Sequence, residues 1–328
     1  MAEQQSGAGC CGASRKSAGA GPGAAYLDAA RAVAPAPEAE QAALLNALVP
    51  IPGGIFEMGA RRSRFPADLD SPRRKVRVAP FLISATAVTT SEYARFAAAT
   101  GYRTVAEQEG WSYVFHLLLP DPTAWPQHPP GLPWWRRVNG ACWSAPEGPG
   151  STFAGREDHP AVHIAWYDAV AYCTWAGLRL PSEAQWERAA RGGLAKRKFP
   201  WGDEMMPNGA RAMNTFQGRF PHHADAGATW TGSLPVGSFA PNGYGLYNMT
   251  GNVWEWTNDS FGPLPEPVRL PPRDPARDPL AAEPAAPRVQ RGGSYLCHDS
   301  YCDRYHVHSR TRNDPESSTG NLGFRVAG

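Results

Sequence analysis

Residues 242–256 read NGYGLYNMTGNVWEW, a stretch rich in glycine, asparagine and tryptophan that shows no long helical period. Asn248 and Glu255 offer hard oxygen atoms, and the glycines allow backbone carbonyls to turn inward, as a calcium-binding loop requires. A tryptophan-rich turn of the core would use the same residues, and their chemistry favours the two interpretations equally. A second candidate loop contains Asn214 and Thr215, with Trp230 further along the chain.

The composition of the whole chain is typical of an ordered domain with many turns. Among the 328 residues are 12 tryptophans, and 34 glycines and 33 prolines make up about a fifth of the chain. Tryptophan packing and bound cations are the usual devices that fix such loops. The sequence therefore predicts a single, loop-rich α+β domain with little regular secondary structure over residues 46–328. A disordered arm rich in alanine, glycine and proline is expected over residues 1–45.

The bulk properties exclude several classes of function. The formal net charge of +2 predicts neither a nucleic-acid partner nor binding to an anionic membrane. No run of 18 apolar residues predicts a membrane span, and residues 1–9 lack the basic and apolar regions of a secretory signal. Six cysteines do not make a disulfide scaffold, and Cys142 and Cys173 read as buried thiols beside aromatic residues. We therefore expect a cytoplasmic protein.

Three helices carry clear start signals. Thr89 with Glu92, and Ser182 with Gln185, form the capping-box pattern in which each side chain of the pair bonds the other's backbone amide. The predicted helices cover residues 89–100, 166–176 and 182–191, and a short helix is expected near residues 38–48. Strands are expected within residues 50–58, 74–78, 289–295 and 322–327, and the proline-rich residues 261–287 are expected to form a surface excursion.

Residues 291–302 read RGGSYLCHDSYC, and four residues separate Cys297 from Cys302, so the two thiols can meet in a loop. Three interpretations compete: a structural disulfide, a zinc site, and a reactive dithiol that holds a soft metal such as Cu(I). A closed zinc site needs four ligands, and no second cysteine pair is available. Histidines that could complete a zinc site are His298, His306 and His308, and polar groups that a dithiol site or ordinary loop hydrogen bonds would use are Ser294, His298 and Tyr301.

Three segments together resemble the sulfatase-modifying-factor family. They are residues 242–256, the string RLPSEAQWE at residues 179–187, and the string GNLGFR at residues 320–325. The resemblance covers about residues 48–328 and implies the fold of that family. Residues 292–305 resemble the formylglycine-generating members, which carry two cysteines at this spacing, whereas paralogues without that activity lack the pair. Iron-dependent members usually carry an added helical domain, for which this chain has no room.

The resemblance implies a copper-dependent oxidase that acts on unfolded sulfatases. It would use dioxygen to convert the cysteine of a Cys-x-Pro-x-Arg motif into Cα-formylglycine. Cys297 and Cys302 would bind Cu(I), and the substrate thiolate would become a third sulfur ligand. Ser294 would position the substrate or the oxygen-derived species, and residues expected to line the pocket are Tyr301, His298 and Asn321. Alternatives are an inactive, peptide-binding member of the same fold and an oxidase that acts on a small thiol.

The resemblance also implies two Ca²⁺ sites. Ligands of the first would be the side chains of Asn248 and Glu255 and the carbonyls of Gly251 and Val253. Ligands of the second would be Asn214, Thr215 and Trp230. The second site is weakened because Ala228 stands where the family commonly has an aspartate, unless Asp225 or water substitutes.

Two departures from the family pattern bear on compartment and specificity. Secreted members bridge the cysteine that matches Cys173 to a partner whose position is Val307 here, which supports a reduced, cytoplasmic form. Trp111, next to Ser112, stands where some members have an acidic residue near the channel for the substrate arginine. An arginine could stack on Trp111 through a cation–π contact, although a packing tryptophan would look the same.

Residues 11–15 read CGASR and fit Cys-x-Ala-x-Arg, a tolerated form of the substrate motif. Chance would also produce this string in an arm so rich in glycine, alanine and serine. The sharper prediction is that the segment Cys11–Arg15 enters an active site as pseudosubstrate or self-substrate. A flexible chain of about 30 residues is long enough to reach the site.

Overall fold

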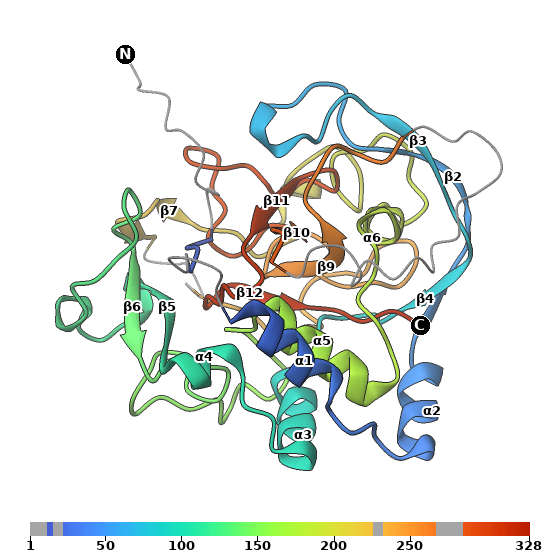
Figure 1. Cartoon of the computed structure of the whole chain (residues 1–328). Coiled ribbons are helices and arrows are strands. Elements are labelled where there is room, and N and C mark those ends of the chain that lie inside the picture. The colour runs from blue at the N-terminus through green and yellow to red at the C-terminus, as the bar shows by residue number, and fades with distance from the viewer. Residues whose placement is uncertain (1–11, 16–21, 226–231, 267–284) are drawn as a thin grey trace.

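A four-stranded sheet at the centre of the molecule contains parts of two of the three family-like segments, residues 242–256 and 320–325 (Figure 1). In this computed structural model, which describes residues 12–15, 22–225, 232–266 and 285–328, β9 (Trp254–Ser260) lies between two strands that come later in the chain. It pairs antiparallel with β10 (Arg288–Arg291) and parallel with β12 (Leu322–Phe324), and β11 (Arg310–Asn313) completes the sheet beside β10. Loops connect the strands of this sheet, and residues 292–309 form the loop between β10 and β11.

Three helices cover one side of this sheet (Figure 1). α5 (Trp166–Ala176) is apolar around most of its circumference and is therefore buried, as such helices are. α1 (Gly23–Arg31) packs against it, with Tyr26 and Leu27 in the main hydrophobic core. α3 (Thr90–Thr100) begins at the predicted Thr89–Glu92 capping box. The remaining α-helices are α2 (Glu38–Asn46), α4 (Val105–Glu109) and α6 (Glu183–Ala190).

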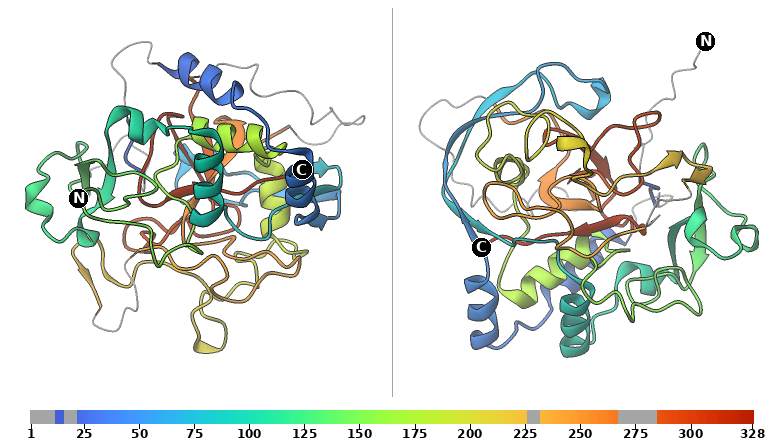
Figure 2. Two further views of the ribbon diagram at one scale, coloured as in Figure 1. Left: turned by 90° about the horizontal axis from the view of Figure 1, so that it is seen from below. Right: turned by 180° about the vertical axis from the view of Figure 1, so that it is seen from behind.

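Two-stranded ribbons surround the central sheet. Both views from front and behind place β2–β3 around one outer edge and β5–β6 with β7–β8 at the opposite edge (Figure 1 and Figure 2). Their bounds are β1 (Val49–Ile51) with β4 (Phe81–Ile83), β2 (Gly54–Met58) with β3 (Arg74–Val78), β5 (Trp111–Phe115) with β6 (Trp135–Asn139), and β7 (Gly218–Arg219) with β8 (His223–Ala224). Short 3-10 turns occupy Pro66–Asp68, His116–Leu118, Pro122–Ala124 and Pro207–Gly209.

The predicted fold class, a single loop-rich α+β domain, is confirmed, as are the three predicted helices, two of which begin at the predicted capping boxes. The short helix expected near residues 38–48 is found as α2. The prediction of a disordered arm over residues 1–45 is wrong for α1, which forms at Gly23–Arg31 and buries apolar side chains against α5. Of the predicted surface excursion, residues 267–284 lie outside the described residues. In the described part of the chain, no helix is long and apolar enough to cross a membrane.

Candidate active site

The two cysteines lie in a loop that leaves the end of β10. Gly292 and Gly293 open this loop with φ angles of 96° and 77°, and a Cβ on Gly293 would lie 2.5 Å from the carbonyl oxygen of Arg304. The Cys297 amide then donates to the Ser294 carbonyl (2.9 Å), and the Cys302 amide donates to the His298 carbonyl (2.7 Å). These turns bring the Sγ atoms of Cys297 and Cys302 to 3.5 Å from each other, as their spacing predicted.

The redox state of the cysteines separates the three interpretations of the pair. Cys302 is disulfide-bonded and Cys297 belongs to no disulfide, so the two cysteines are not bridged to each other. Among the described residues, no group of three or more histidine, cysteine, aspartate or glutamate side chains is placed to hold a metal ion. The loop brings two sulfur atoms together, which is donor chemistry that suits a soft metal.

Both sulfur atoms lie in a buried environment, and the fully buried Cys297 has an altered acidity. Burial raises the pKa of the Cys297 thiol to about 11, although hydrogen bonds from Ser294 act in the opposite direction. Cys297 is therefore a neutral thiol at pH 7 in this state. A metal that binds there has to displace the thiol proton, because the thiolate is the ligand.

Two of the predicted polar residues meet beside Cys297. The Asn321 side-chain amide donates to Ser294 Oγ (2.9 Å), and its oxygen accepts a hydrogen bond from Thr319 Oγ1 (2.7 Å). All three side chains are fully buried. The Ser294 backbone amide lies 3.4 Å from Cys297 Sγ, so the serine is in direct contact with the sulfur.

Of the other two residues expected at the pocket, His298 lines it, whereas Tyr301 packs against aromatic rings outside its lining. His298 lines a cavity of about 300 Å³ that also contacts Cys297, and its Nδ1 atom lies 2.7 Å from Ser300 Oγ. The Tyr301 ring stacks on Phe220 at a centroid distance of 5.0 Å and meets the edge of Trp134 at 5.1 Å. The cavity gives the buried Cys297 a route to solvent for a small molecule or a substrate side chain. Its further walls include Met205, Met213, Phe216 and Tyr305.

Trp111 and Ser112 lie on β5, and two arginines of this chain make cation–π contacts with Trp111. The guanidinium carbon of Arg15 lies 3.6 Å and that of Arg137 lies 4.2 Å from the centre of the ring. The predicted contact with a substrate arginine stays a prediction. Ser112 Oγ instead bonds to Ser318 Oγ (2.9 Å) and to His163 Nδ1 (2.8 Å). Ser112 is therefore part of the buried hydrogen-bonded group with Ser318 and His163, next to Trp111 in the chain.

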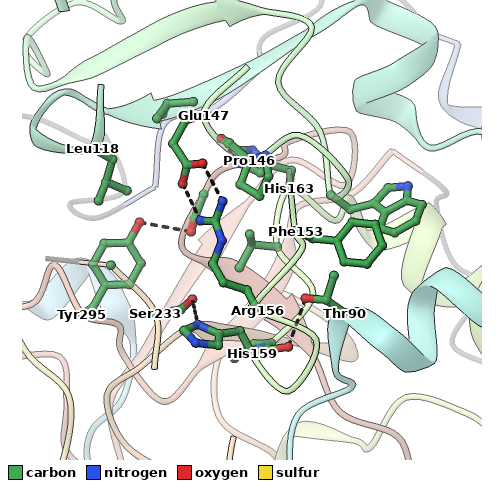
Figure 3. Close-up of a pocket in the computed structure, with 16 residues that line it drawn as sticks. Thr90, Leu118, Pro146, Glu147, Phe153, Arg156, His159, His163, Ser233 and Tyr295 are labelled. Carbon is green, nitrogen blue, oxygen red and sulfur yellow. Dashed lines mark hydrogen bonds and ion pairs between the residues drawn. The ribbon is translucent and has the colours of Figure 1, made fainter. Parts of the chain in front are cut away.

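A small pocket of about 30 Å³, roughly the size of one water molecule, lies beside His163. Arg156 and Glu147 meet there in a two-pronged ion pair of 2.7 and 2.8 Å, and the Tyr295 hydroxyl donates to the Gly320 carbonyl (Figure 3). Burial lowers the pKa of His163 to about 4, so this histidine is neutral at pH 7. The pocket is a buried polar support, because its charged groups already pair with each other.

The polar residues around Arg15 were not found from the sequence. Ser317 and Ser318 are buried and contact the arm, and they directly precede Thr319, which bonds Asn321. A run of three hydroxyl residues next to the string GNLGFR was the available signal.

The first predicted calcium loop contains an unsatisfied oxygen. Asn248 Oδ1 is buried and has no hydrogen-bond partner within the described part of the chain, whereas its Nδ2 donates to the Val236 carbonyl (2.8 Å). A hard cation beside this oxygen would supply the missing partner. Glu255 is already engaged, because its carboxylate accepts from Arg325 Nε (2.7 Å), Arg325 Nη2 (2.8 Å) and Trp186 Nε1 (2.7 Å). The donor set fits Ca²⁺ with one carboxylate lone-pair position left for it.

The second predicted calcium loop is only partly described. Asn214 and Thr215 are buried, and the Asn214 amide donates to the Gly232 carbonyl (2.9 Å) and to Asn252 Oδ1 (3.1 Å). Trp230 lies outside the described residues.

Residues 33–328 match the family described as the sulfatase-modifying factor enzyme 1-like domain. The chain belongs to this family. Its match begins inside the segment expected to be a disordered arm, consistent with the order of α2.

Relatives in this family include enzymes and a protein named inactive. A formylglycine-generating enzyme of Thermomonospora curvata is 49% identical over 286 residues, which cover 87% of this chain and 94% of the relative. The inactive C-alpha-formylglycine-generating enzyme 2 of Bos taurus is 39% identical over 285 residues, 85% of this chain and 87% of the relative. The solved structure of PvdO from Pseudomonas aeruginosa matches with a TM-score of 0.57 at 24% identity, over 85% of this chain and 93% of that one, which shows a shared fold. Activity must therefore be argued from the site.

Proposed function

We propose that this protein is a formylglycine-generating enzyme, which converts a cysteine of an unfolded sulfatase polypeptide into Cα-formylglycine. The observation that carries the proposal is the buried pair Cys297 and Cys302, with sulfur atoms 3.5 Å apart beside the Ser294–Asn321 hydrogen bond. A relative with this name is 49% identical over most of both chains. A loop built around two neighbouring thiols favours an oxidase over an inactive, peptide-binding member of the family.

Ser294 is the residue that we assign to the reacting sulfur. Its Oγ atom accepts hydrogen bonds from Asn321 Nδ2 (2.9 Å) and from the Leu296 amide (3.3 Å). With both acceptor positions used, the hydroxyl proton is directed at a third partner. Cys297 Sγ or the sulfur of a bound cysteine is that partner, because the Ser294 side chain already hydrogen-bonds Cys297. Asn321 fixes the orientation of this donor.

The sulfur pair also fits the proposed copper cofactor. Cys297 and Cys302 would hold Cu(I), which when bound would supply the activation of dioxygen next to the substrate thiol. Cys302 has to be reduced before it can serve, since the thiolate and not a disulfide sulfur is the metal ligand. Phe216 and Tyr305 supply buried apolar walls to the cavity beside the reacting sulfur.

A peptide that contains Cys-x-Pro-x-Arg tests the activity. The reduced protein is loaded with Cu(I), and conversion of the peptide cysteine to formylglycine is measured by mass spectrometry. Conversion should vanish in Cys297→Ser and Cys302→Ser and persist in Cys142→Ser, a matched control that changes a free thiol outside the site. A folded, copper-loaded protein that leaves the peptide unchanged would overturn the proposal, and oxidation of free cysteine in the same assay would indicate a small-thiol substrate.

Several finer features are part of the same proposal. The partner is an unfolded sulfatase polypeptide, dioxygen is the co-substrate, and the chain's own Cys11–Arg15 segment competes for the same place. Ca²⁺ is held by Asn248, Gly251, Val253 and Glu255, which is supported by the unpartnered Asn248 oxygen. A second Ca²⁺ at Asn214, Thr215 and Trp230 and a cytoplasmic location stay predictions.

A further inference from the structure

Residues 12–15 lie against the catalytic domain with every second side chain buried. Ala13 is fully buried and Arg15 is 7% exposed, whereas Gly12 and Ser14 are half-buried. Alternation of this kind is typical of an extended segment that inserts side chains into separate pockets. In the motif Cys-x-Ala-x-Arg, the two buried residues occupy the two specified positions after the cysteine.

The segment is held through its backbone as well as its side chains. The Asn313 side-chain amide donates to the Ala13 carbonyl (3.2 Å), and the Arg15 amide donates to Ser317 Oγ (2.9 Å). The Ser14 hydroxyl donates to the Asp314 carboxylate. These partners all lie within residues 313–317, from the last residue of β11 into the loop before β12, so one stretch of the domain follows the arm along its length.

Arg15 occupies a pocket built for a guanidinium group. Its Nη2 atom donates to the Trp111 carbonyl (2.6 Å) and to Ser318 Oγ (3.3 Å), and the group stacks on the Trp111 ring. Its Nη1 atom lies 3.6 Å from a carboxylate oxygen of Glu109. The Tyr26 hydroxyl donates to the other oxygen of that carboxylate (2.6 Å) and fixes its position. The pocket thus combines an aromatic face, a carbonyl and an anion, all of which favour arginine.

The pocket of Ala13 is continuous with the cysteine loop. Ala13 belongs to a hydrophobic cluster that includes Tyr295 and Leu296, the two residues directly before Cys297. Phe216, another member, donates its amide to the Cys297 carbonyl (3.2 Å) and lines the cavity beside that cysteine. The arm therefore runs from the arginine pocket towards the reactive sulfur atoms.

We propose that Gly12–Arg15 is an intramolecular pseudosubstrate, which fills the groove for the residues that follow the cysteine of a client peptide and must leave before the client binds. The proposed function supplies only the chemical class of the client, an unfolded peptide with a Cys-x-Pro-x-Arg or Cys-x-Ala-x-Arg motif. Occupancy of the groove by the arm can be tested without turnover.

The strength of competition by the arm sets the expected change in affinity for an external peptide. A tethered segment competes at an effective concentration on the order of millimolar, because only a short stretch separates Arg15 from α1. Loss of a buried arginine anchor typically weakens binding roughly 30-fold. Arg15→Ala should therefore release the arm and tighten the binding of an external peptide by about 10- to 30-fold.

The experiment measures peptide binding by fluorescence anisotropy in a thiol reductant, because Cys302 is disulfide-bonded in this structure. The probe is a labelled peptide containing Ser-x-Pro-x-Arg, in which serine replaces the reactive cysteine so that no reaction occurs. The proteins are the full chain, Arg15→Ala, a deletion of residues 2–15 that leaves α1 intact, and Lys16→Ala. Lys16→Ala removes the same charge from the next residue of the arm and is the matched control.

Arg15→Ala and the deletion should bind the peptide about 10- to 30-fold more tightly than the full chain, whereas Lys16→Ala should change affinity by less than about 2-fold. Equal affinities in all four proteins, or no peptide binding in the deletion variant, would overturn the proposal. If a cysteine peptide is converted but the variants bind peptide no more tightly, the pseudosubstrate proposal is refuted and the proposed activity is retained. If the variants bind peptide more tightly but no conversion occurs, the pseudosubstrate proposal is retained and the proposed activity is refuted.

Discussion

Replacement of Glu187 by glutamine should severely destabilise the fold near the catalytic loop. Glu187 lies fully buried in α6, where its carboxylate accepts from Arg191 Nε (3.0 Å) and from the Gly59 amide (2.8 Å) and pairs with Arg291. Arg291 is the last residue of β10, directly before the glycine turn that leads to Ser294. The carboxylate therefore neutralises two guanidinium groups and anchors the start of the cysteine loop.

The expected loss in free energy of unfolding follows from this burial. Glu187→Gln keeps the shape of the side chain but leaves Arg191 and Arg291 without their shared anion. Removal of one partner of a buried ion pair costs about 3–5 kcal/mol. In a urea titration followed by tryptophan fluorescence, an m value of about 3 kcal/mol/M would turn this loss into a midpoint shift of about 1 M or more.

The effect of Glu187→Gln should also depend on pH. Burial raises the pKa of Glu187, but the neighbouring Arg191 and Arg291 charges outweigh burial and hold it below its usual range. A carboxyl with a depressed pKa stabilises the fold above the pKa of the unfolded chain, and this contribution is lost as pH falls through the folded pKa. The difference between wild type and Glu187→Gln should therefore be largest near pH 7 and shrink in acid.

An exposed ion pair provides the control for Glu187→Gln. Arg197 and Asp203 are 2.5 Å apart, but their side chains are 55% and 47% exposed. Asp203→Asn should change the free energy of unfolding far less than Glu187→Gln, because water screens such a pair. If Glu187→Gln cost no more than Asp203→Asn, the view that this buried carboxylate anchors β10 would be refuted.

Three further outcomes are expected. His163 is neutral in the fold because its pKa is about 4, whereas the pKa of an unfolded histidine is 6.5. The free energy of unfolding should therefore be highest above pH 6.5 and fall by up to about 3 kcal/mol between pH 6.5 and 4. Urea titrations at stepped pH should show a flatter slope for His163→Gln. Asn321→Ala should lower kcat about 10- to 100-fold with little change in KM, because Ser294 loses its orienting donor; an unchanged kcat would contradict that role. Ca²⁺ should raise the Tm of the wild type, because binding stabilises the fold by about 3 kcal/mol when free Ca²⁺ is at about 100 times its Kd. Asn248→Ala should abolish this rise, and a wild type whose Tm does not respond to chelators would contradict the calcium proposal.

The parts of the fold that the sequence predicts are those encoded by neighbouring residues. The capping boxes at Thr89 and Ser182 each involve residues three positions apart, and both helices begin where this local chemistry places them. The Cys297–Cys302 spacing likewise closes within one loop. Contacts of this kind need no knowledge of the remaining chain.

The missed parts depend on residues that are distant in the chain. β9 pairs in parallel with β12, which brings Trp254 opposite Leu322, and no local period marks that pairing. α1 lies in a segment whose alanine, glycine and proline content resembles disorder, but Tyr26 and Leu27 become buried once α5 is present. The wall of Ser317 and Ser318 around Arg15 depends in the same way on the tertiary fold.

The arm has the features of a ligand that can be displaced. Arg15 Nε is buried and finds no hydrogen-bond partner in the described ranges, so the guanidinium group is incompletely satisfied. Ala13 belongs to the same hydrophobic cluster as Phe115, Trp135 and Tyr295, so a proline at this position would add two more carbon atoms to an apolar environment. At about 0.8 kcal/mol for each buried CH₂, a client with proline at this position gains roughly 10-fold in affinity over the arm's alanine. An alanine in the arm and a proline in the client would therefore let the groove stay closed at rest and still yield to the substrate.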